Sequence, residues 1–594
     1  MHRPRILAAL ACVGIALVAT FPGVLTLGTR LIGNEDVDNW NHAWGPWWYW
    51  TSISAGELPW RTLLIGAPKG GILWFIDPIG AVLGAPLVPL FGSVFAYNAV
   101  IMTYVAVAAA GARSLARAFG ATDAHSWLAA VAVAASPYVL SEVSNGVSEA
   151  VNVGPGLFAL AAAWRALSED ALPPYDVPRA SHRRFVIAGI WLGITAIGTY
   201  YYAFAAGLVV ATWFVAKGRA LMSRPVWVGG VILALVSASV AAGPLGLMLA
   251  STSASEALVH RGAPSAADLG LLLRHNAVDP RTFLAPGDFQ SVDLTARGEA
   301  FRHSSYLGWI ALALALASRR TWALVGAIPV VVFSLGRWLW WGSDWAHAAP
   351  GQVISLPLGW FGTALPALFT HAQRLGAPAI GIVAAAAAVG VARVGRYWPA
   401  AVLAVGLDGL LVGPSPWPIP RSPALDLSAH AALADAPPVV CGDRTGNIVL
   451  DLPGELGATM ATSRYFLYQT AHGRPVPWSP DARSGTSSLL SISPVGVLFR
   501  ASAATRAEAT GRGAWASGGW PPSIDTGELC RAGVGWIVLH RELERGHQGT
   551  EWLTATLTDW LGRPTELGSH LTWTTVSNGG RKQVHPPLSA AGPP

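Results

Sequence analysis

Charged residues are scarce in this chain of 594 residues. Asp, Glu, Lys and Arg make up 12% of it, whereas 52% of the residues are hydrophobic and the mean hydropathy is +0.43. An ordinary soluble domain carries about 25% charged residues. The formal net charge of +6 is small for this length, and the Lys and Arg residues fall in short segments between apolar runs. The composition therefore excludes a soluble protein and a nucleic-acid partner, and it predicts a polytopic membrane protein.

Several cofactor and catalytic motifs are also missing. The sequence contains no P-loop, no complete G-x-G-x-x-G fingerprint after a strand, no H-E-x-x-H and no paired C-x-x-C. These absences argue against nucleotide hydrolysis and against redox cofactors.

Cysteine is rare, with three residues in the whole chain. Cys12 lies in the first apolar segment, and Cys441 and Cys530 lie in the polar C-terminal third. If that third is outside the cytoplasm, the latter two either form a disulfide or remain two unpaired thiols.

Long apolar runs predict about eleven transmembrane spans, since each can cross a bilayer as a helix. They lie near residues 5–27, 93–112, 125–141, 147–166, 184–198, 199–216, 226–250, 304–318, 321–338, 376–392 and 397–413. We interpret the first run as a retained helix and not as a cleaved signal peptide, because no clean small-x-small site follows it. The basic segments then alternate to one side, which places the N-terminus in the cytoplasm and the C-terminal third outside.

The chain divides at the Pro-rich run 414–423. We expect a transmembrane domain over 1–413 with a first outer loop at about 28–92, a linker at 414–423, an extracytoplasmic α/β or α+β domain over 424–577, and a disordered tail over 578–594. Predicted strands lie at 447–453, 495–500 and 534–541, and a helix at 550–561. Prolines in 71–91 predict broken or interfacial helices, and 199–202 is either a hairpin or part of one long helix.

Tryptophan is abundant, with 28 residues. Many fall at 40–60 and 338–345, two loops that we expect to lie on the membrane surface because Trp favours the headgroup layer.

The first outer loop carries an acidic group followed by a histidine, in GNEDVDNWNHAWGPWWYW from Gly33 to Trp50. Asp36 and Asp38 are two residues apart and can converge, with Glu35 beside them. Such carboxylates suit a general base for an acceptor hydroxyl or, with His42, the ligands of a divalent cation such as Mg or Mn. The alternative is that Asp38 caps a helix starting at Asn39 and that its neighbours are solvated.

Three further sets of residues are candidates for substrate binding. Glu142, Asn145 and Glu149 lie at a short turn between two spans, where buried charge is costly unless it faces a cavity, although a solvated turn is the simpler interpretation. Tyr201, in a run of three tyrosines, either lines a groove or anchors the interface. Arg302 and Arg374 could each hold a phosphate by their guanidinium fork or act as interface anchors. These candidates are Arg302, Arg374, Glu149, Asn145 and Tyr201.

At this point the sequence resembles a known group. The acidic loop with its Trp-rich helix, PKGG and DPIG (68–71 and 77–80), AYN at the second long span, SSYLGWIALALAL (304–316), IVLDLP, YFLYQTAHGRPVP (465–477) and VGWIVLHR are similar to strings of the bacterial GT-C glycosyltransferase superfamily, in its poorly characterised branches. The resemblance implies a GT-C fold in the bacterial inner membrane, a polyprenyl-phosphate-linked sugar donor and a catalytic Asp in the first outer loop. By position that base is Asp36 or Asp38, although many members have Gly-Asp where this chain has Gly33-Asn34-Glu35.

The resulting hypothesis is a hexosyltransferase-type enzyme that moves a sugar from the lipid donor to a glycan, lipid or protein acceptor of the cell envelope on the outer face. One alternative is a lipid or polysaccharide transporter or flippase, although Glu142, Glu149 and Asp408 are nearly the only carboxylates in the spans. Another is a catalytically silent GT-C relative that acts in envelope assembly.

Overall fold

The computed structural model describes residues 3–575 except 36, 168–178, 217–223, 260–265, 288–300, 343, 363–368, 455–462, 479–488, 490–491, 510–522, 544–546 and 568. The chain forms two compact units. The first, a helical unit, comprises residues 1–50, 75–250 and 261–423, and the second comprises residues 51–74, 251–260 and 424–594. The predicted tail at 578–594 lies outside the described residues.

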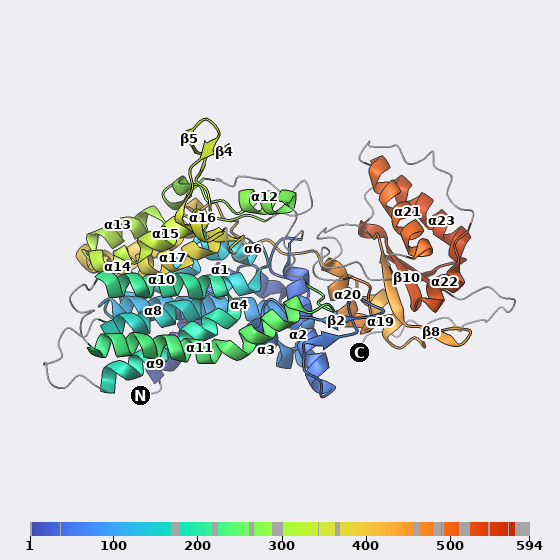
Figure 1. Ribbon diagram of the computed structural model, residues 1–594, viewed down its shortest axis with the longest axis horizontal. Coiled ribbons are helices and arrows are strands. Elements are labelled where there is room, and N and C mark those ends of the chain that lie inside the picture. Colours follow the sequence, from blue (N-terminus) through green and yellow to red (C-terminus); the bar gives the residue numbers. More distant parts are fainter. Residues whose placement is uncertain are drawn as a thin grey trace. The chain divides into compact units, whose positions relative to one another are not determined.

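The helical unit is built mainly from apolar helices that pack side by side (Figure 1). Its first half contains α1 (Arg3–Ala19), η1 (Gly23–Thr26), α2 (Asn39–Ser54), α3 (Pro78–Gly84), η2 (Ala85–Leu87), α4 (Val88–Ala118), α5 (Ser126–Ala134), α6 (Pro137–Ser144), α7 (Ser148–Val151), α8 (Gly154–Leu167), α9 (Arg179–Gly198), α10 (Tyr200–Ala216) and α11 (Arg224–Ser253). Its second half contains α12 (Ala266–His275), η4 (Pro280–Phe283), α13 (Trp309–Ala317), α14 (Thr321–Val325), α15 (Ala327–Ser334), the short strands β3 (Trp340–Trp341), β4 (Asp344–Trp345), β5 (His347–Ala349) and β6 (Gln352–Val353), then α16 (Pro357–Gly362), η6 (Ala372–Gly376), α17 (Ala377–Gly390), η7 (Val391–Tyr397), α18 (Trp398–Leu407) and η8 (Asp408–Val412).

Five helical stretches among the described residues are long and apolar enough to cross a membrane. They are Pro78–Ala118, Ser126–Ser144, Ser148–Leu167, Trp227–Ser253 and Ala372–Val412, and shorter apolar helices lie at Pro4–Ala19, Tyr200–Ala216 and Thr321–Ser334. The junction left open at 199–202 is a break between two helices, because α9 ends at Gly198 and α10 begins at Tyr200 and packs against it. The proline-rich stretch 71–91 contains the short helices α3 and η2, as its prolines predict.

The Trp-rich helix α2 differs from the expectation of a surface loop. Trp40, Trp44 and Trp48 are spaced four residues apart and are fully buried, and the rings of the last two stack at 5.2 Å between centroids. A spacing of four residues places side chains on one face of a helix. The prediction of a surface location is therefore wrong for this stripe, whose indole rings form core.

Short helices separate the long ones where the polar side chains lie. The predicted span at 125–141 is broken after α5, because Ser136 caps α6 by accepting the N–H of Val139 and Pro137 occupies the first turn. The four-residue helix α7 follows, before α8 begins at Gly154. As a result, α6 and α7 are two short helices inside the helical unit, and they carry Glu142 and Glu149 respectively.

The second unit contains a mixed four-stranded sheet in the order β11-β12-β10-β9. Its elements are β1 (Arg61–Thr62), β2 (Gly71–Ile72), α19 (Ser428–Ala434), β7 (Val439–Cys441), β8 (Arg444–Gly446), β9 (Ile448–Leu452), α20 (Arg464–His472), α21 (Ser493–Ala509), α22 (Thr526–Arg531), β10 (Val534–His540), η11 (Arg541–Leu543), α23 (His547–Leu561), β11 (Thr565–Leu567) and β12 (His570–Thr574). Strand β9 pairs with β10 in parallel, and β12 pairs with β10 and β11 antiparallel. In Figure 1, α19 and α20 lie on one side of β10 and α21, α22 and α23 lie on the other.

The predicted strands at 447–453 and 534–541 correspond to β9 and β10, and the predicted helix at 550–561 lies in α23. The predicted strand at 495–500 is wrong, because VGVLFR lies in α21. Ser493 and Pro494 precede this run, and a Ser-Pro pair followed by an apolar run is a helix-start signal. Local propensity for a strand is thus overridden by the continuation of the helix to Ala509.

Two segments from the N-terminal half belong to the second unit. Residues 51–74 contribute the β1/β2 hairpin, and Gly66 N–H and Val476 N–H bond to the carbonyls of Trp478 and Leu64. Residues 251–260 join this hairpin through the Ile72 N–H, which donates to the Glu256 carbonyl, and through the salt bridge from Arg61 to Glu256 at 2.7 Å. The C-terminal third therefore shares its unit with parts of the predicted outer loops.

A disulfide joins Cys441 at the end of β7 to Cys530 in α22, with Cα atoms 5.9 Å apart. The bond closes 89 residues of sequence separation within the second unit. The alternative of two unpaired thiols is thereby resolved in favour of a bond.

Candidate functional site

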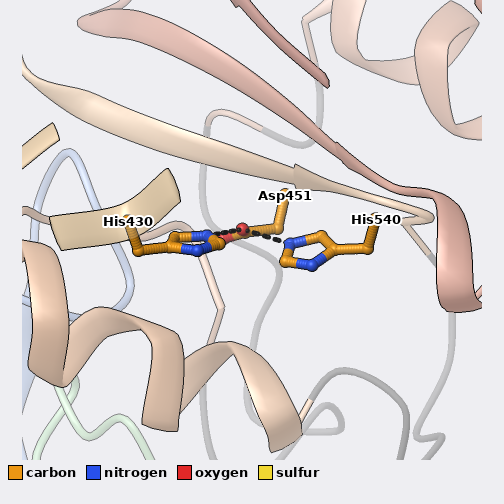
Figure 2. Close-up of side chains that lie close together, drawn as sticks. All are labelled: His430, Asp451 and His540. Carbon is orange, nitrogen blue, oxygen red and sulfur yellow. Dashed lines mark hydrogen bonds and ion pairs between the residues drawn. The ribbon is translucent and has the colours of Figure 1, made fainter. Parts of the chain in front are cut away.

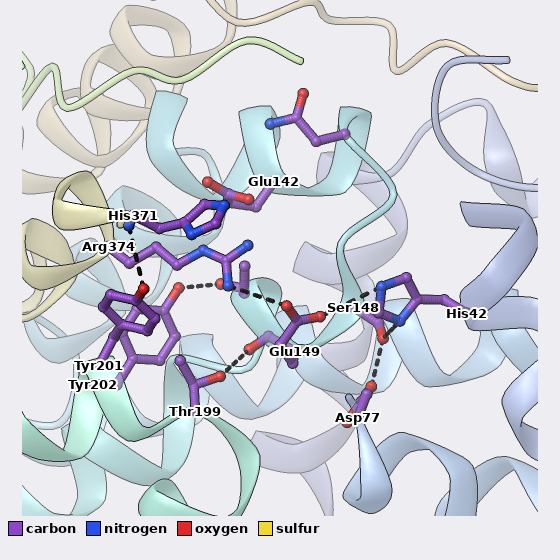
Figure 3. A network of polar contacts seen from close by, with 12 residues as sticks. His42, Asp77, Glu142, Ser148, Glu149, Thr199, Tyr201, Tyr202, His371 and Arg374 are labelled. Atoms are coloured by element: carbon purple, nitrogen blue, oxygen red, sulfur yellow. Dashed lines mark hydrogen bonds and ion pairs between the residues drawn. The ribbon is translucent and has the colours of Figure 1, made fainter. Parts of the chain in front are cut away.

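Four of the side chains that the sequence predicts for a site meet inside the helical unit. Figure 3 shows Arg374 from η6, Glu149 from α7, Tyr201 from α10 and His42 from α2 around one network of polar contacts. All four are buried. Ionisable groups inside an apolar helical unit are costly and usually mark a functional site.

An ion pair forms the centre of this network. Arg374 Nη1 donates to Glu149 Oε1 at 3.1 Å, and the guanidinium carbon lies 5.9 Å from the centre of the Tyr201 ring. The Tyr201 hydroxyl in turn accepts the backbone N–H of His371 at 3.2 Å. The guanidinium is therefore held between a carboxylate and an aromatic ring, and its Nε has no hydrogen-bond partner among the described residues.

A second chain of contacts reaches Glu149 from the other side. Asp77 caps α3 by accepting the N–H of Gly80, and it also accepts the Tyr104 hydroxyl at 2.9 Å and the Ser148 hydroxyl at 2.5 Å. Since Ser148 donates its only proton to Asp77, its oxygen must accept from His42 Nδ1, which lies 2.8 Å away.

The proton on Nδ1 decides the state of the rest of the His42 ring. A neutral ring then carries a lone pair on Nε2, and this atom lies 3.5 Å from Glu149 Oε2. Glu149 Oε2 is buried without a hydrogen-bond donor among the described residues. Two acceptor atoms that face each other need a proton or a cation between them. This pair of atoms therefore fits a shared proton or a divalent metal ion.

Glu142 begins a neighbouring branch of the network. Its Oε1 lies 3.2 Å from His303 Nδ1, and the other ring nitrogen of His303 lies 3.4 Å from Gln373 Nε2, which donates to Asn276 at 2.9 Å. A polar pocket opens next to this branch. It is lined by His275, Asn276, Ala277, Val278, Asp279, Thr282, His303, Ser305 and Gln373.

Asn145 and Arg302 contact each other instead of facing the ion pair. The Asn145 amide donates to the Arg302 carbonyl at 2.6 Å and accepts the Arg302 N–H at 2.9 Å. These two hydrogen bonds to the backbone of Arg302 fix the segment before His303. Arg302 itself is exposed. Asn145 thus positions the loop, and Arg302 does not join the network in this state.

Helix α2 begins at Asn39, which is the start expected in the alternative that Asp38 caps a helix. The His42 N–H donates to the Asp38 carbonyl at 3.2 Å, so the two residues are one helical turn apart. The Asp38 residue itself is half-buried. Glu35 is exposed, and Asp36 lies outside the described residues.

Residues that the sequence reasoning did not predict support the short helix α7. The Thr199 hydroxyl donates to the Glu149 carbonyl at 2.9 Å, and the Tyr202 hydroxyl contacts the Ala150 carbonyl and lies 2.7 Å from the Tyr138 hydroxyl. Asp77 and Ser148 were missed as well. The available signals were the motif DPIG and the serine directly before Glu149.

Asp408, the third carboxylate in the predicted spans, accepts hydrogen bonds at the start of α13. It accepts the Tyr306 hydroxyl at 3.0 Å and the Ile310 N–H at 3.2 Å, and Tyr306 accepts the Trp309 N–H. Helix α13 follows Gly308, which provides no side-chain cap, so Asp408 and Tyr306 satisfy its first two N–H groups. Asp408 therefore has a structural role and does not extend a proton path.

The fold and the site together define a membrane-type helical protein whose interior holds a carboxylate, a histidine and an arginine. No family model and no curated protein matches the sequence. Among solved structures, the archaeal oligosaccharyltransferase AglB from Archaeoglobus fulgidus, in complex with an inhibitory peptide and a dolichol-phosphate, matches with a TM-score of 0.50 and 14% identity over 94% of this chain and 70% of AglB.

Two other solved structures are also similar. The arabinofuranosyltransferase AftD from Mycobacteria gives a TM-score of 0.49 and 15% identity over 97% of this chain and 40% of AftD. ArnT from Cupriavidus metallidurans, bound to undecaprenyl phosphate, gives 0.38 and 14% over 84% of this chain and 71% of ArnT. At this identity the similarity to AglB shows a shared fold, as the resemblance in the sequence implies.

Proposed function

We propose that this chain is an integral-membrane glycosyltransferase that transfers a sugar from a polyprenyl-phosphate-linked donor to a cell-envelope acceptor on the extracytoplasmic face. The observation that carries the proposal is the buried contact of His42, Glu149 and Arg374 inside a fold shared with AglB, which was solved with a dolichol-phosphate. A transporter would instead need ionisable groups along a path through the spans.

The roles follow from the chemistry of each group. Glycosyl transfer needs a base that takes the proton of the acceptor hydroxyl, and we assign this role to Asp36 or Asp38 of the acidic sequence motif, with Glu35 as a further candidate. The leaving group is a lipid phosphate, and Arg374 stabilises its negative charge. The Nε–H of Arg374 has no hydrogen-bond partner among the described residues, so it is a donor that a phosphate oxygen could use.

A divalent cation, when bound, would supply Lewis-acid stabilisation of the leaving phosphate. His42 Nε2 and Glu149 Oε2 are the atoms that fit it, because both are acceptors and lie 3.5 Å apart. Asp77 and Ser148 hold the His42 ring in the tautomer that leaves Nε2 free for this purpose. Asp36 and Asp38, expected to share the metal with His42, remain candidates as the base.

The disulfide bears on which side of the membrane the second unit lies. Disulfides persist in oxidising compartments and are rare in the cytosol. The bond between Cys441 and Cys530 therefore favours an extracytoplasmic location for the second unit, as the positive-inside rule predicts.

The test is transfer of radiolabelled sugar from a panel of polyprenyl-phosphate sugars in membranes that contain the wild-type chain or the Asp36→Asn/Asp38→Asn double variant. We expect incorporation by the wild type and a loss of roughly 100-fold or more in the variant, the lower range for removal of a general base. Equal incorporation by the two proteins would remove these aspartates from the mechanism.

A further inference from the structure

A cluster of ionisable side chains lies on one face of the sheet in the second unit, where the proposed transfer reaction does not use it. Asp451 of β9 pairs with Val538 of β10, so it points to the same side as His540, two residues further on. His540 pairs directly with His570 of β12. Helix α19 adds His430 to this face, as Figure 2 shows for its contact with Asp451.

Three of these residues present ligand atoms to a common point. His430 Nε2 and His540 Nε2 lie 3.2 and 2.8 Å from the same oxygen, Asp451 Oδ1, and all three side chains are 0% exposed. The three ligand atoms lie within 4.8 Å of one another. Ligands of a tetrahedral zinc ion, at bonds of about 2.0 Å, are separated by roughly 3.3 Å. Small side-chain shifts are sufficient to place one ion between these atoms.

The hydrogen bonding around Asp451 is incomplete without a cation. Asp451 Oδ2 and His430 Nδ1 are buried and have no hydrogen-bond partner among the described residues. The buried carboxylate of Asp451 therefore attracts a cation to the point that the two imidazole nitrogens face.

The residues behind His540 match the outer shell of a metal site. Its Nδ1 lies 3.5 Å from Glu542 Oε1, and this oxygen also lies 3.1 Å from His570 Nε2 and accepts the Tyr468 hydroxyl at 3.1 Å. A histidine that binds a metal through one nitrogen usually donates its other N–H to a carboxylate, which fixes the ring. Glu542 is placed for that role.

A fourth buried histidine is excluded as a ligand and provides a control. The ring of His472 stacks on that of His430 at an angle of 30°, with centroids 5.5 Å apart. Its Nδ1 accepts the backbone N–H of Arg474 at 3.0 Å, so the proton of the neutral ring is on Nε2. No lone pair remains for a metal.

We propose that His430, Asp451 and His540 form a binding site for a divalent transition-metal ion of the zinc class, which fastens α19 to strands β9 and β10. Two imidazole nitrogens and one carboxylate are a donor set that suits zinc. The ion stabilises the second unit by linking three elements that are separated in sequence, and its binding free energy adds to that of folding.

The test measures zinc bound to the full-length chain, purified in detergent through a tag without histidine and equilibrated with Zn²⁺. The variants are His430→Gln and His540→Gln, and His472→Asn is the control. Glutamine keeps an N–H that can donate to Asp451, so a network held only by hydrogen bonds tolerates it. We expect bound zinc in the wild type and the control, and an affinity lower by roughly 100-fold or more in both glutamine variants, at least the upper range seen for outer-shell changes.

A second measurement uses the wild-type chain alone, so that it does not depend on the folding of a variant. Protein stripped by a chelator and reloaded with Co²⁺ should show the intense visible absorption of a tetrahedral cobalt site. A folded wild-type chain that binds neither Zn²⁺ nor Co²⁺ would overturn the proposal, as would folded glutamine variants with wild-type zinc content.

Discussion

At the scale of single residues, the ion pair between Arg374 and Glu149 compensates two buried charges that would each be costly alone. Both are buried, and removal of one partner leaves the other charge without compensation. Breaking a buried ion pair typically costs about 3–5 kcal/mol, whereas replacing both partners by neutral groups can be close to neutral. The network is therefore a charge-balanced unit and not a collection of independent contacts.

This balance leads to the first prediction at this scale. Arg374→Met should lower the thermal unfolding temperature of the purified chain strongly, and the double variant Arg374→Met/Glu149→Gln should recover much of the loss. The measurement is a thermal melt in detergent of the wild type, both single variants and the double variant. Additive effects of the two substitutions would show that the residues do not depend on each other.

The same residues show what the sequence could predict. His42, Glu149, Tyr201 and Arg374 are polar groups within strongly apolar surroundings, and that contrast is visible in one sequence. Their partners were less visible, because Ser148 is chemically ordinary and becomes informative only when the fold places it between two ionisable groups.

At the scale of elements, the start of α13 depends on a residue almost a hundred positions away. The carboxylate of Asp408 accepts the Ile310 N–H and the Tyr306 hydroxyl. Helix starts without an acceptor for their first N–H groups are less stable, and loss of a cap costs about 0.5–2 kcal/mol.

We therefore predict that Asp408→Ala lowers the free energy of unfolding by about 1–2 kcal/mol. Asp408→Asn should lose less, because its amide oxygen still accepts one of the two bonds. Thermal melts of both variants check this, and equal losses would argue against the capping role. Sugar transfer should persist in each folded variant, since Asp408 is not part of the site.

Elements also explain where prediction from the sequence fails. The strands at 447–453 and 534–541 were predicted from short apolar runs bounded by Gly, Pro and Asp, whereas VGVLFR is an equally short run that lies in a helix. Short apolar runs are ambiguous between the two structures, and the flanking residues decide. Asp451 and His540 were overlooked because each is a single polar residue in an apolar strand, and only the register brings them together.

At the scale of the whole molecule, the second unit is assembled from three stretches of chain. The disulfide spans 89 residues of its sequence, and loss of a bond of this kind in a small domain costs roughly 2–5 kcal/mol. Stability of the second unit therefore depends on the redox state of the compartment in which it lies.

The corresponding prediction concerns both stability and topology. Protein isolated from cells under thiol-blocking conditions should contain the Cys441–Cys530 bond, as detected by mass spectrometry of non-reduced peptides, and Cys441→Ser/Cys530→Ser should unfold at a lower temperature. Recovery of both thiols in the blocked, reduced form from freshly lysed cells would contradict an extracytoplasmic second unit.

If the proposed function is right, sugar transfer depends on the buried network in the helical unit. The most direct measurement compares transfer of labelled sugar by membranes that contain wild type, Glu149→Gln or the matched control Asp408→Asn, each at equal amounts of folded protein. We expect a loss of at least about 100-fold for Glu149→Gln, the range for one electrostatic group at a reacting centre, and little change for Asp408→Asn. Sugar transfer by Glu149→Gln at the wild-type level, or equal losses in both variants, would contradict a role of the network in transfer.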